Sequence, residues 1–455
     1  MYSREELADV IKAYDVRGVV GDVFDENLVR DIGSALGCLL REEGEQTLAI
    51  GHDMRESSPR LVEALIEGVL PQGIDVVDLG LTSTDELYFA SGSLHCAGVM
   101  FTASHNPARY NGMKMCRAGA RPIGKDTGLD AMCTMLVEGI PPFSGQPGQR
   151  RELNVLTAYA DHVKSLVDLS SMRPLVVAVD AANGMGGLTV PAVFEGLPIE
   201  LKPLYFELDG TFPNHEANPL EPANLRDLQE FVQETGADIG LAFDGDADRC
   251  FVVDELGQPV SPSAICALIA ERYLATRPGA TIIHNLITSQ SVPETIARNG
   301  GVALKTRVGH SFIKAAMAES GAVFGGEHSA HYYFTEFYNA DSGILAALHV
   351  LAALGSQSKP LSELMASYQH YEASGEINST VNDQQERVDA VLDAFKERIA
   401  SVERLDGVSV KLQGTPAWFN IRASNTEPLL RLNVEARLRS EVEDLVSEIL
   451  SIIRA

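Results

Sequence analysis

The chain repeats one pattern of apolar and polar positions three times. In each repeat, three apolar, β-branched runs lead into polar residues and are separated by helix-length intervals, which predicts alternating strands and helices. The expected strand segments are 47–55, 74–80 and 95–103 in the first repeat, 174–184, 199–206 and 237–243 in the second, and 280–289, 302–309 and 321–327 in the third. This order predicts three related α/β domains with mixed sheets.

The C-terminal part of the chain follows a different pattern. Two segments carry apolar residues at helical spacing, namely Val388, Val391, Leu392 and Phe395 in one and Val442, Leu445, Ile449 and Ile452 in the other. Strand-like runs lie between them at 408–412, 417–424 and 426–436. We therefore expect a smaller α+β domain at this end of the chain.

Segments rich in proline, glycine and polar residues mark three breaks between domains. They lie at 139–151, around 254–262 and near 355–360. The predicted domains are residues 1–150, 151–254, 255–365 and 366–455. The longest apolar run, 343–355, is interrupted by His349 and is too short to span a bilayer, so it predicts a buried helix.

Composition limits the binding partners and the cellular compartment to be expected. The 455 residues carry a formal net charge of −27, which argues against a surface for nucleic acid or anionic membranes. The six cysteines form no C-x-x-C pair, so we expect neither a disulfide framework nor a zinc site. The N-terminus is charged from its fourth residue, unlike a signal peptide. These features fit the reducing cytoplasm and make each basic residue inside a motif more informative.

The third strand of the second repeat leads into the acidic segment DGDADR (244–249). Asp244, Asp246 and Asp248 would share one side of an extended chain, whereas a loop could wrap them around a cation, and carboxylate oxygens suit Mg²⁺. An EF-hand is excluded because Arg249 stands where that loop needs glycine. Arg249 beside three acids fits contact with an anion that the metal also touches. A solvated acidic turn is the alternative.

The third strand of the first repeat ends in TASHNP (102–107), which places Ser104 at a strand end. A serine can carry a phosphoryl group where a metal and cations, here including Lys114, neutralise the charge that develops during transfer. No G-x-S-x-G elbow surrounds Ser104, which argues against an esterase triad. An ordinary turn capped by His105 is the alternative.

Two further segments suit a sugar phosphate. In GEHSAH (326–331), alternating Glu327, Ser329 and His331 would point the same way on an extended chain and could bind sugar hydroxyls, unless the segment is only an exposed polar strand. The segment RASNTEP offers a candidate phosphate cradle of Arg422, Ser424, Asn425 and Thr426. An ordinary turn with a surface arginine would look the same there. Arg17 and His310 are less specific candidates.

Seven segments, taken in order, resemble the α-D-phosphohexomutase superfamily in its bacterial phosphomannomutase/phosphoglucomutase branch. They are KAYDVRG, TASHNP, NGMK, DGDADR, VGH, GEHSAH and RASNTEP. The resemblance extends over essentially the whole chain. The resemblance implies four domains around a central cleft. It also implies a small-molecule sugar phosphate as partner, with no nucleic acid and no membrane, and a monomer or weak homodimer.

The resemblance implies roles for single residues. Ser104 would be the phosphoserine in a loop shaped by His105, and Mg²⁺ would be held by Ser104, Asp244, Asp246 and Asp248. Sugar hydroxyls would be bound by Glu327 and Ser329. The non-reacting phosphate would lie on Arg422, Ser424, Asn425 and Thr426. The rest of the cleft would be lined by Arg17, Lys114, Arg249, His310 and His331.

The implied reaction moves the phosphoryl group of Ser104 to the free hydroxyl of a hexose 1- or 6-phosphate. The resulting 1,6-bisphosphate would turn over so that its other phosphate meets Ser104, and a hexose 1,6-bisphosphate would act as activator. Arg249 and Lys114 would neutralise charge, and His310, or else Lys114, would carry the proton. The last domain would close as a lid that excludes water.

The identity of the sugar is left open by the sequence. Ala330 stands where the family often has glycine, and His328 stands where phosphoglucosamine mutases typically have glutamine, which disfavours that branch. Mannose and glucose differ at C2 only, so one contact could decide between them. Two other functions remain as alternatives: a haloacid dehalogenase-type phosphatase with Asp244 as nucleophile, and a non-catalytic sugar-phosphate-binding protein.

Overall fold

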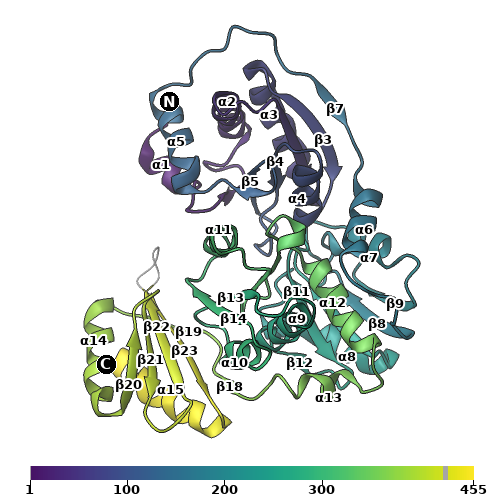
Figure 1. The fold of residues 1–455 in the computed structure, drawn as a ribbon. Coiled ribbons are helices and arrows are strands. Elements are labelled where there is room, and N and C mark those ends of the chain that lie inside the picture. The colour runs from purple at the N-terminus through teal and green to yellow at the C-terminus, as the bar shows by residue number, and fades with distance from the viewer. Residues whose placement is uncertain (1, 424–428) are drawn as a thin grey trace. The chain divides into compact units, whose positions relative to one another are not determined.

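The computed structural model describes residues 2–423 and 429–455, except for the side chain of His310. The chain forms two compact units. The first consists of Met1–Val260 and Ser329–Ser362, and the second of Ser261–His328 and Glu363–Ala455. Figure 1 labels many of the elements of each unit.

The first domain of the first unit is built on a mixed sheet. Its strands are β1 (Val16–Val19), β2 (Thr47–His52), β3 (Asp75–Leu81), β4 (Ala97–Phe101), β5 (Tyr110–Arg117), β6 (Arg121–Pro122) and β7 (Arg150–Glu152). Its helices are α1 (Arg4–Ala8), α2 (Glu26–Glu42), α3 (Ser58–Val69), α4 (Thr84–Ser93) and α5 (Leu129–Glu138). The sheet order is β1–β5–β4–β2–β3–β7, with β6 paired to β5. Because β7 pairs with β3, the expected linker 139–151 ends inside this sheet.

The second domain of the first unit repeats this plan. It contains β8 (Leu175–Asp180), β9 (Ile199–Leu204), β10 (Ile239–Phe243), β11 (Cys250–Asp254), β12 (Pro259–Val260), α6 (Leu156–Ser165), α7 (Gly186–Phe194) and α8 (Arg226–Thr235). The sheet order is β12–β11–β10–β8–β9. The later segment of this unit adds β16 (Tyr332–Phe334), β17 (Ala340–Asp341) and α12 (Gly343–Gly355). Every residue of α12 is buried, which confirms the predicted buried helix.

The second unit begins with a third set of parallel strands. The elements of this set are β13 (Thr281–Asn285), β14 (Val302–Thr306), β15 (Phe324–Gly326), α9 (Pro262–Thr276), α10 (Ser291–Arg298) and α11 (His310–Ser320). The short helix α13 (Leu361–Met365) then leads toward the C-terminal domain. Both β14 and β15 pair in parallel with β13.

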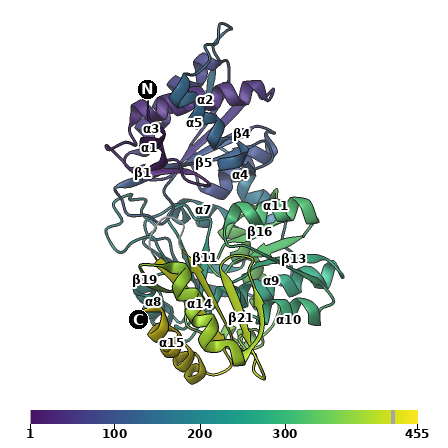
Figure 2. The same ribbon diagram turned by 90° about the vertical axis from the view of Figure 1, so that its left-hand side faces the viewer.

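The C-terminal domain is an antiparallel sheet covered by two helices. It consists of β18 (Glu372–Ala373), β19 (Ile377–Thr380), β20 (Ile399–Glu403), β21 (Val408–Leu412), β22 (Trp418–Ala423), β23 (Leu429–Ala436), α14 (Gln384–Phe395) and α15 (Arg439–Ile453). Alternate residues of β21, β22 and β23 share one apolar core with α14 and α15, so both helices cover the same face (Figures 1 and 2). This arrangement confirms the predicted α+β domain.

The three α/β domains share one strand order. The first strand of each repeat lies between the second and third, as β3–β2–β4, β9–β8–β10 and β14–β13–β15, and all these pairs are parallel. This confirms the predicted relation between the repeats. Ligands of open α/β sheets bind beyond the carboxyl ends of such strands, so the residues that follow β4, β10 and β15 are the first candidates for a site.

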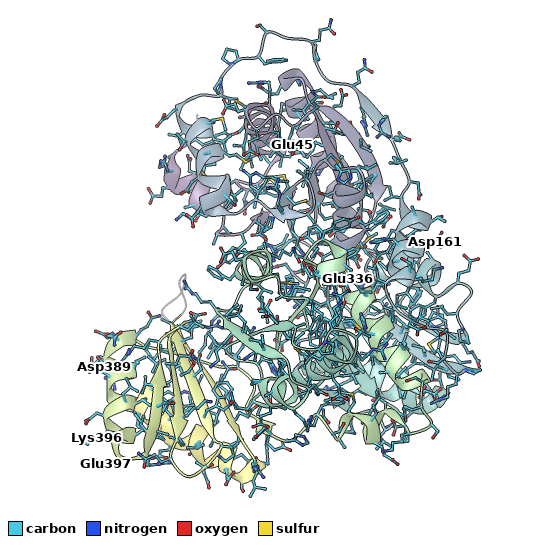
Figure 3. The ribbon with its side chains drawn as sticks, viewed as in Figure 1. Glu45, Asp161, Glu336, Asp389, Lys396 and Glu397 are labelled. Atoms are coloured by element: carbon cyan, nitrogen blue, oxygen red, sulfur yellow. The ribbon has the colours of Figure 1, made fainter. Side chains whose placement is uncertain are left out.

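The surface of both units reflects the acidic composition. Asp161, Asp389 and Glu397, for example, are exposed side chains (Figure 3). Within the described part of the chain, no helix is both long enough and apolar enough to cross a bilayer.

Candidate active site

Ser104 lies in a turn directly after the buried strand β4. Its backbone N–H donates to Thr102 Oγ1 at 2.9 Å, and its φ of +50° is left-handed, a conformation that costs a non-glycine residue about 1–2 kcal/mol. Ser104 Oγ donates to Asp244 Oδ2 at 2.8 Å and lies 3.1 Å from His105 Nδ1. The side chain is 5% exposed, so the hydroxyl is held in a defined place rather than displayed on the surface.

The acidic segment after β10 forms a loop that meets the Ser104 turn. A Cβ at Gly245 would lie 2.4 Å from the carbonyl oxygen of Ser104, so glycine is needed for this close approach. Ala247 adopts a φ of +62°, which turns the chain back into β11. Asp244, Asp246 and Asp248 are all buried, and their carboxylate oxygens lie within 4.8 Å of one another. Of the two arrangements left open by the sequence, the loop is the one observed.

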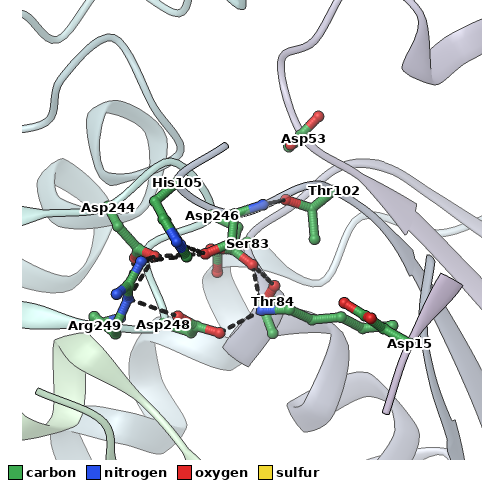
Figure 4. Close-up of polar contacts among 12 residues, drawn as sticks. Asp15, Asp53, Ser83, Thr84, Thr102, His105, Asp244, Asp246, Asp248 and Arg249 are labelled. Atoms are coloured by element: carbon green, nitrogen blue, oxygen red, sulfur yellow. Dashed lines mark hydrogen bonds and ion pairs between the residues drawn. The ribbon is translucent and has the colours of Figure 1, made fainter. Parts of the chain in front are cut away.

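Lys114 and Arg249 supply positive charge to these carboxylates. Lys114 Nζ donates to Asp246 Oδ2 at 2.6 Å and to Asp248 Oδ2 at 2.5 Å. The Nε of Arg249 donates to Asp244 Oδ2 at 2.9 Å, and its Nη2 lies 3.4 Å from Ser104 Oγ (Figure 4). The fully buried Arg249 therefore contacts both the candidate nucleophile and a candidate metal ligand.

The carboxylates fit a hard divalent cation. Thr84 Oγ1 donates to Asp246 Oδ2 at 2.5 Å, so that oxygen accepts from both Thr84 and Lys114. In contrast, the buried oxygens Asp246 Oδ1 and Asp248 Oδ1 have no hydrogen-bond partner among the described residues. A buried carboxylate oxygen without a partner is costly, and a cation such as Mg²⁺ would satisfy both.

The buried cluster shifts the titration of its members. Burial, together with Asp248 and Asp246, raises the pKa of Asp244 despite the opposing charge of Arg249. Burial also acts to raise the pKa of Asp248, but Lys114, His331 and Arg249 together outweigh it, and the pKa is lowered. Burial lowers the pKa of His105 to about 2, with Arg249 adding to the effect, so His105 is neutral at physiological pH.

Arg17 supports the serine turn from β1, an edge strand of the sheet. It lies on β1, which pairs antiparallel with β5, the strand that carries Lys114. Arg17 Nη1 donates to Asn106 Oδ1 at 2.7 Å, and its Nη2 donates to Asp15 Oδ2 at 2.6 Å. The structure thus brings Arg17 to the same loop as Ser104.

The GEHSAH segment is not extended, which corrects the expected alternation of side chains. Ala330 has a left-handed φ of +64°, so the chain turns between Glu327 and His331. Within the first unit, Ser329 Oγ lies 3.0 Å from His331 Nδ1, and His331 Nε2 lies 3.8 Å from Asp248 Oδ1. Ser329 and His331 therefore belong with the metal-binding loop.

Glu327 lies in the second unit, where it is buried. Its Oε2 accepts from Asn285 Nδ2 at 2.9 Å and from the backbone N–H of Gly309 at 3.3 Å. Asn285 is itself fixed, because its Oδ1 accepts from Thr288 Oγ1 at 2.7 Å. Asn285 ends the first strand of the third repeat but is not among the site residues predicted from sequence.

Arg422 is the described member of the expected phosphate cradle. It lies at the end of β22, where its Nη2 donates to Glu376 Oε2 at 3.0 Å and its Nη1 lies 3.6 Å from Asp406 Oδ2. The other expected members, Ser424, Asn425 and Thr426, lie outside the described residues, as does the side chain of His310.

Two residues at the Ser104 and metal-binding loops were missed from sequence. Thr84 begins α4 and lies 162 positions before Asp246, so no local pattern connects them. Arg55, which follows β2, is buried against the Ser104 turn. The available signal for Arg55 is its place at the polar end of segment 47–55, directly after the first strand of a repeat.

Comparisons with known proteins find similarity along nearly the whole chain. The phosphoglucomutase/phosphomannomutase family matches through its alpha/beta/alpha domain I at residues 8–133, domain II at 157–257, domain III at 261–371 and C-terminal domain at 376–452. The crystal structure of a phosphoglucomutase/phosphomannomutase family protein from Burkholderia thailandensis superposes with a TM-score of 0.90 at 32% identity, over 100% of this chain and 98% of that one.

Curated relatives show similarity of the same extent. The chain is 41% identical over 429 residues to the phosphohexose mutases of Xanthomonas campestris pv. campestris. It is 40% identical over 436 residues to the phosphomannomutase of Escherichia coli (strain K12). Each alignment covers 94% of both chains, which confirms the resemblance drawn from the seven segments. With four domains matched in order and identity across nearly its whole length, the chain belongs to the phosphoglucomutase/phosphomannomutase family of phosphotransferase isomerases.

Proposed function

We propose that the protein is a phosphohexomutase that moves a phosphoryl group reversibly between C1 and C6 of mannose phosphate, glucose phosphate or both, through phosphorylated Ser104. The observation that carries this proposal is the placement of Ser104 Oγ on Asp244 and beside Arg249, within a buried cluster of carboxylates and cations. The names of the relatives, phosphohexose mutases and phosphomannomutase, support the same chemistry.

Each half-reaction exchanges one phosphorus–oxygen bond for another. The bond between phosphorus and Ser104 Oγ breaks, and phosphorus bonds to the free hydroxyl oxygen of the hexose phosphate. The sugar hydroxyl loses its proton, and Ser104 Oγ gains one. The second half-reaction runs in reverse from the other phosphate of the 1,6-bisphosphate, so the net change is an isomerisation. A hexose 1,6-bisphosphate is accordingly the proposed activator, because it can phosphorylate Ser104.

Lys114 is better suited to neutralising charge than to carrying the proton. Although burial opposes the charged form, Asp246 and Asp248 raise its pKa, so the ammonium group is retained. Lys114, Arg249 and Arg17 would then stabilise the charge on the transferring phosphoryl group. His310 remains the proposed general acid and base on sequence grounds, since its side chain lies outside the described residues.

Mg²⁺ would be held by Ser104, Asp244, Asp246 and Asp248. When bound, it supplies positive charge opposite the oxygens of the phosphoryl group. The protein would fix the orientation of the carboxylates. Thr84 and Lys114 donate to Asp246 Oδ2 and leave Asp246 Oδ1 available. The neutral His105 beside Ser104 would shape the turn without adding charge.

The sugar-binding and phosphate-binding roles rest on sequence together with local geometry. Glu327, Ser329 and His331 would bind sugar hydroxyls, and Asn285 would orient Glu327. The non-reacting phosphate would lie on Arg422, Ser424, Asn425 and Thr426. Because Arg422 contacts Glu376 and Asp406, a bound phosphate would compete with two carboxylates for its N–H donors.

The wider setting is part of the same proposal. The protein would act in the cytoplasm on a small-molecule sugar phosphate, as a monomer or weak homodimer, with the C-terminal domain as a lid. The boundaries at about residues 150, 254 and 365 stay predictions.

The surroundings of Asp244 disfavour the phosphatase alternative. Asp244 Oδ2 accepts from Ser104 Oγ and Arg249 Nε, and Asp244 Oδ1 accepts from the backbone N–H of Arg249 at 3.2 Å. A carboxylate with both oxygens engaged is a poor nucleophile. Ser104, which approaches the same cluster, is the better candidate.

A coupled initial-rate assay with Mg²⁺ and a trace of glucose 1,6-bisphosphate tests the proposal. Mannose 1-phosphate, glucose 1-phosphate and glucosamine 1-phosphate are compared for the wild type, Ser104→Ala and the control Ser93→Ala, which changes an exposed serine on α4. We expect turnover of one or both of the first two sugars, lost only in Ser104→Ala. Turnover of glucosamine 1-phosphate alone would contradict the proposed substrate. Release of phosphate through a hydroxylamine-sensitive adduct would overturn the mutase assignment.

A further inference from the structure

Arg55 lies buried directly beneath the serine loop, which we define as residues 102–111. The side chain is 1% exposed. Four of its N–H donors reach carbonyl oxygens of the loop, with Nη1 donating to Pro107 O at 2.9 Å and Tyr110 O at 2.9 Å, and Nη2 to Ser104 O at 2.9 Å and Asn106 O at 2.7 Å. One planar guanidinium thus holds several points of the loop in a fixed geometry.

Asp53 fixes the guanidinium of Arg55. Its Oδ2 accepts from Arg55 Nε at 3.1 Å, while its Oδ1 accepts from Arg55 N at 3.1 Å and from Ser58 Oγ at 2.9 Å. Asp53 is completely buried. A buried ion pair is retained at low cost only when its remaining hydrogen-bonding groups are satisfied, and all five N–H donors of Arg55 have acceptors.

The second domain of the first unit also packs against Arg55. A Cβ at Gly210 would lie 2.5 Å from Arg55 Cα, and the Phe212 ring centroid lies 5.1 Å from Arg55 Cζ. With its donors engaged and its side chain enclosed, Arg55 is not placed to touch a substrate. Any effect on catalysis would therefore pass through the serine loop.

The serine loop has a conformation that needs support. Ser104 is left-handed, and strained backbone persists where the surrounding structure overdetermines it. Arg55 binds the carbonyl oxygens of Ser104, Asn106 and Pro107 between β4 and β5, and within the described part of the chain no strand pairs with these three residues. Arg55 provides the donors that a sheet partner would otherwise supply.

We propose that Arg55 is a positioning residue for phosphoryl transfer, which holds the carbonyls of the serine loop and thereby places Ser104 Oγ against Asp244 and Arg249. The structural part of the inference concerns the loop alone. Its catalytic part rests on the proposed function, because positioning matters for rate only when Ser104 is the group that transfers phosphate.

Hydrogen exchange tests the structural part without any assay of activity. Arg55→Lys keeps the charge but loses the planar fork, and Arg60→Lys is the matched control, since Arg60 is an exposed residue of α3 that pairs with Glu26. We expect amide exchange in the serine loop to rise about tenfold in Arg55→Lys and to stay unchanged in the control. Exchange in the loop equal to that of the wild type would overturn the inference.

A second variant guards against failure of Arg55→Lys to fold. Asp53→Asn keeps the shape of the Asp53 side chain but removes its charge, so it should release Arg55 partly and raise loop exchange in the same direction. If Asp53→Asn folds and the amides of its serine loop exchange like those of the wild type, the Asp53–Arg55 pair does not hold the loop.

Kinetics tests the catalytic part. For Arg55→Lys we expect kcat to fall about 100-fold, the scale of a 1 Å misplacement, with KM within about threefold of the wild type. Free guanidinium ion at about 50 mM should recover at least about tenfold in Arg55→Ala but nothing in Ser104→Ala. An unchanged kcat, or a loss confined to KM, would overturn this part. Absence of mutase turnover in the wild type would instead refute the proposed function, while the exchange result would still decide whether Arg55 holds the loop.

Discussion

In Asp246 and Asp248, two of the candidate metal ligands, the two carboxylate oxygens differ in their hydrogen bonding. Lys114 occupies Asp246 Oδ2 and Asp248 Oδ2, while the Oδ1 atoms of both residues lack hydrogen bonds within the described chain. Thr84 adds a second donor to Asp246 Oδ2, from its hydroxyl, and its backbone N–H donates to the Asp246 carbonyl at 3.1 Å. The side chains are thus oriented before a cation arrives, which lowers the cost of binding one.

Thr84→Val should weaken Mg²⁺ binding about tenfold, because loss of a hydrogen bond that orients a ligand typically costs 10–100-fold in metal affinity. Thr84→Ser keeps the hydroxyl and is the control that should bind like the wild type. Calorimetric titration of the purified proteins with Mg²⁺ measures the affinity without reference to turnover. Equal affinities for Thr84→Val and the wild type would show that Thr84 does not orient the site.

His284 offers a residue-level test of the second unit by pH. It lies on β13, 3% exposed, and burial lowers its pKa to about 4. In the unfolded chain His284 binds a proton near pH 6.5, whereas in the folded chain its side chain stays neutral down to about pH 4. The free energy of unfolding therefore decreases as the pH is lowered from about 6.5 to about 4. His284→Gln should therefore lose about 2 kcal/mol less than the wild type between pH 7 and pH 5.

Urea unfolding followed by fluorescence measures the His284 effect, because Trp418 is the single tryptophan of the chain and lies in the same unit. The exposed His370→Gln variant serves as the control and should track the wild type at both pH values. Parallel pH dependences for His284→Gln and the wild type would contradict the prediction.

At the scale of elements, the wholly buried helix α12 is joined to α4 and α6 through one carboxylate. Ser342 caps α12 by accepting from Leu345 N at 3.0 Å and donates to Asp85 Oδ2 at 2.6 Å. Tyr159 on α6 donates to the same oxygen at 2.6 Å. Burial raises the pKa of Asp85 to about 6, even though these donors favour its charged form.

Ser342→Ala should destabilise the first unit by about 2–3 kcal/mol, since it removes a helix cap and leaves the buried Asp85 short of one donor. Ser356→Ala, at the exposed C-terminal end of the same helix, is the matched control and should change stability by less than about 0.5 kcal/mol. Thermal unfolding compares the two variants. A loss of stability in Ser342→Ala no larger than that in Ser356→Ala would contradict the roles of Ser342 as a helix cap and as a donor to Asp85.

The elements themselves were largely predictable because strands and helices leave local periodic patterns. The three strands of each repeat, the buried run 343–355 and the C-terminal helices all follow from spacing of apolar residues. The Ser104 and metal-binding loops were predictable because polar segments that interrupt apolar strands mark strand ends. Local patterns could not give the turn at Ala330, where a left-handed φ occurs without glycine.

Contacts between distant segments were not predictable from one sequence. Thr84 meets Asp246, Arg55 meets the serine loop and Asn285 meets Glu327 only after the chain has folded. Thr84, Arg55 and Asn285 do not lie in segments whose composition alone marks them as functional. Their roles depend on hydrogen-bond geometry, which a linear pattern does not contain.

At the scale of the whole molecule, the acidic surface and the charged groups of the site act over different distances. The net charge of −27 is spread over a protein of 455 residues, whereas Lys114 and Arg249 touch the candidate ligands directly. Charges farther away than about 8 Å are largely screened at physiological ionic strength. A ligand at Ser104 would therefore respond mainly to the charged groups of the site itself, both the carboxylates and the cations.

The attachment of the C-terminal domain to the third α/β domain gives the last prediction. Glu435 on β23 is buried, and its Oε1 accepts from Trp418 Nε1 at 2.7 Å and from the backbone N–H of Gln290, at the start of α10, at 2.9 Å. Any lid movement of the C-terminal domain must strain or release this attachment. Glu435→Ala leaves both donors unsatisfied, so it should cost about 1–3 kcal/mol in unfolding experiments and shift Trp418 emission to longer wavelength as water reaches the indole. Glu435→Gln retains an acceptor oxygen and should resemble the wild type; equal emission and stability in all three proteins would show that Glu435 does not join the two domains.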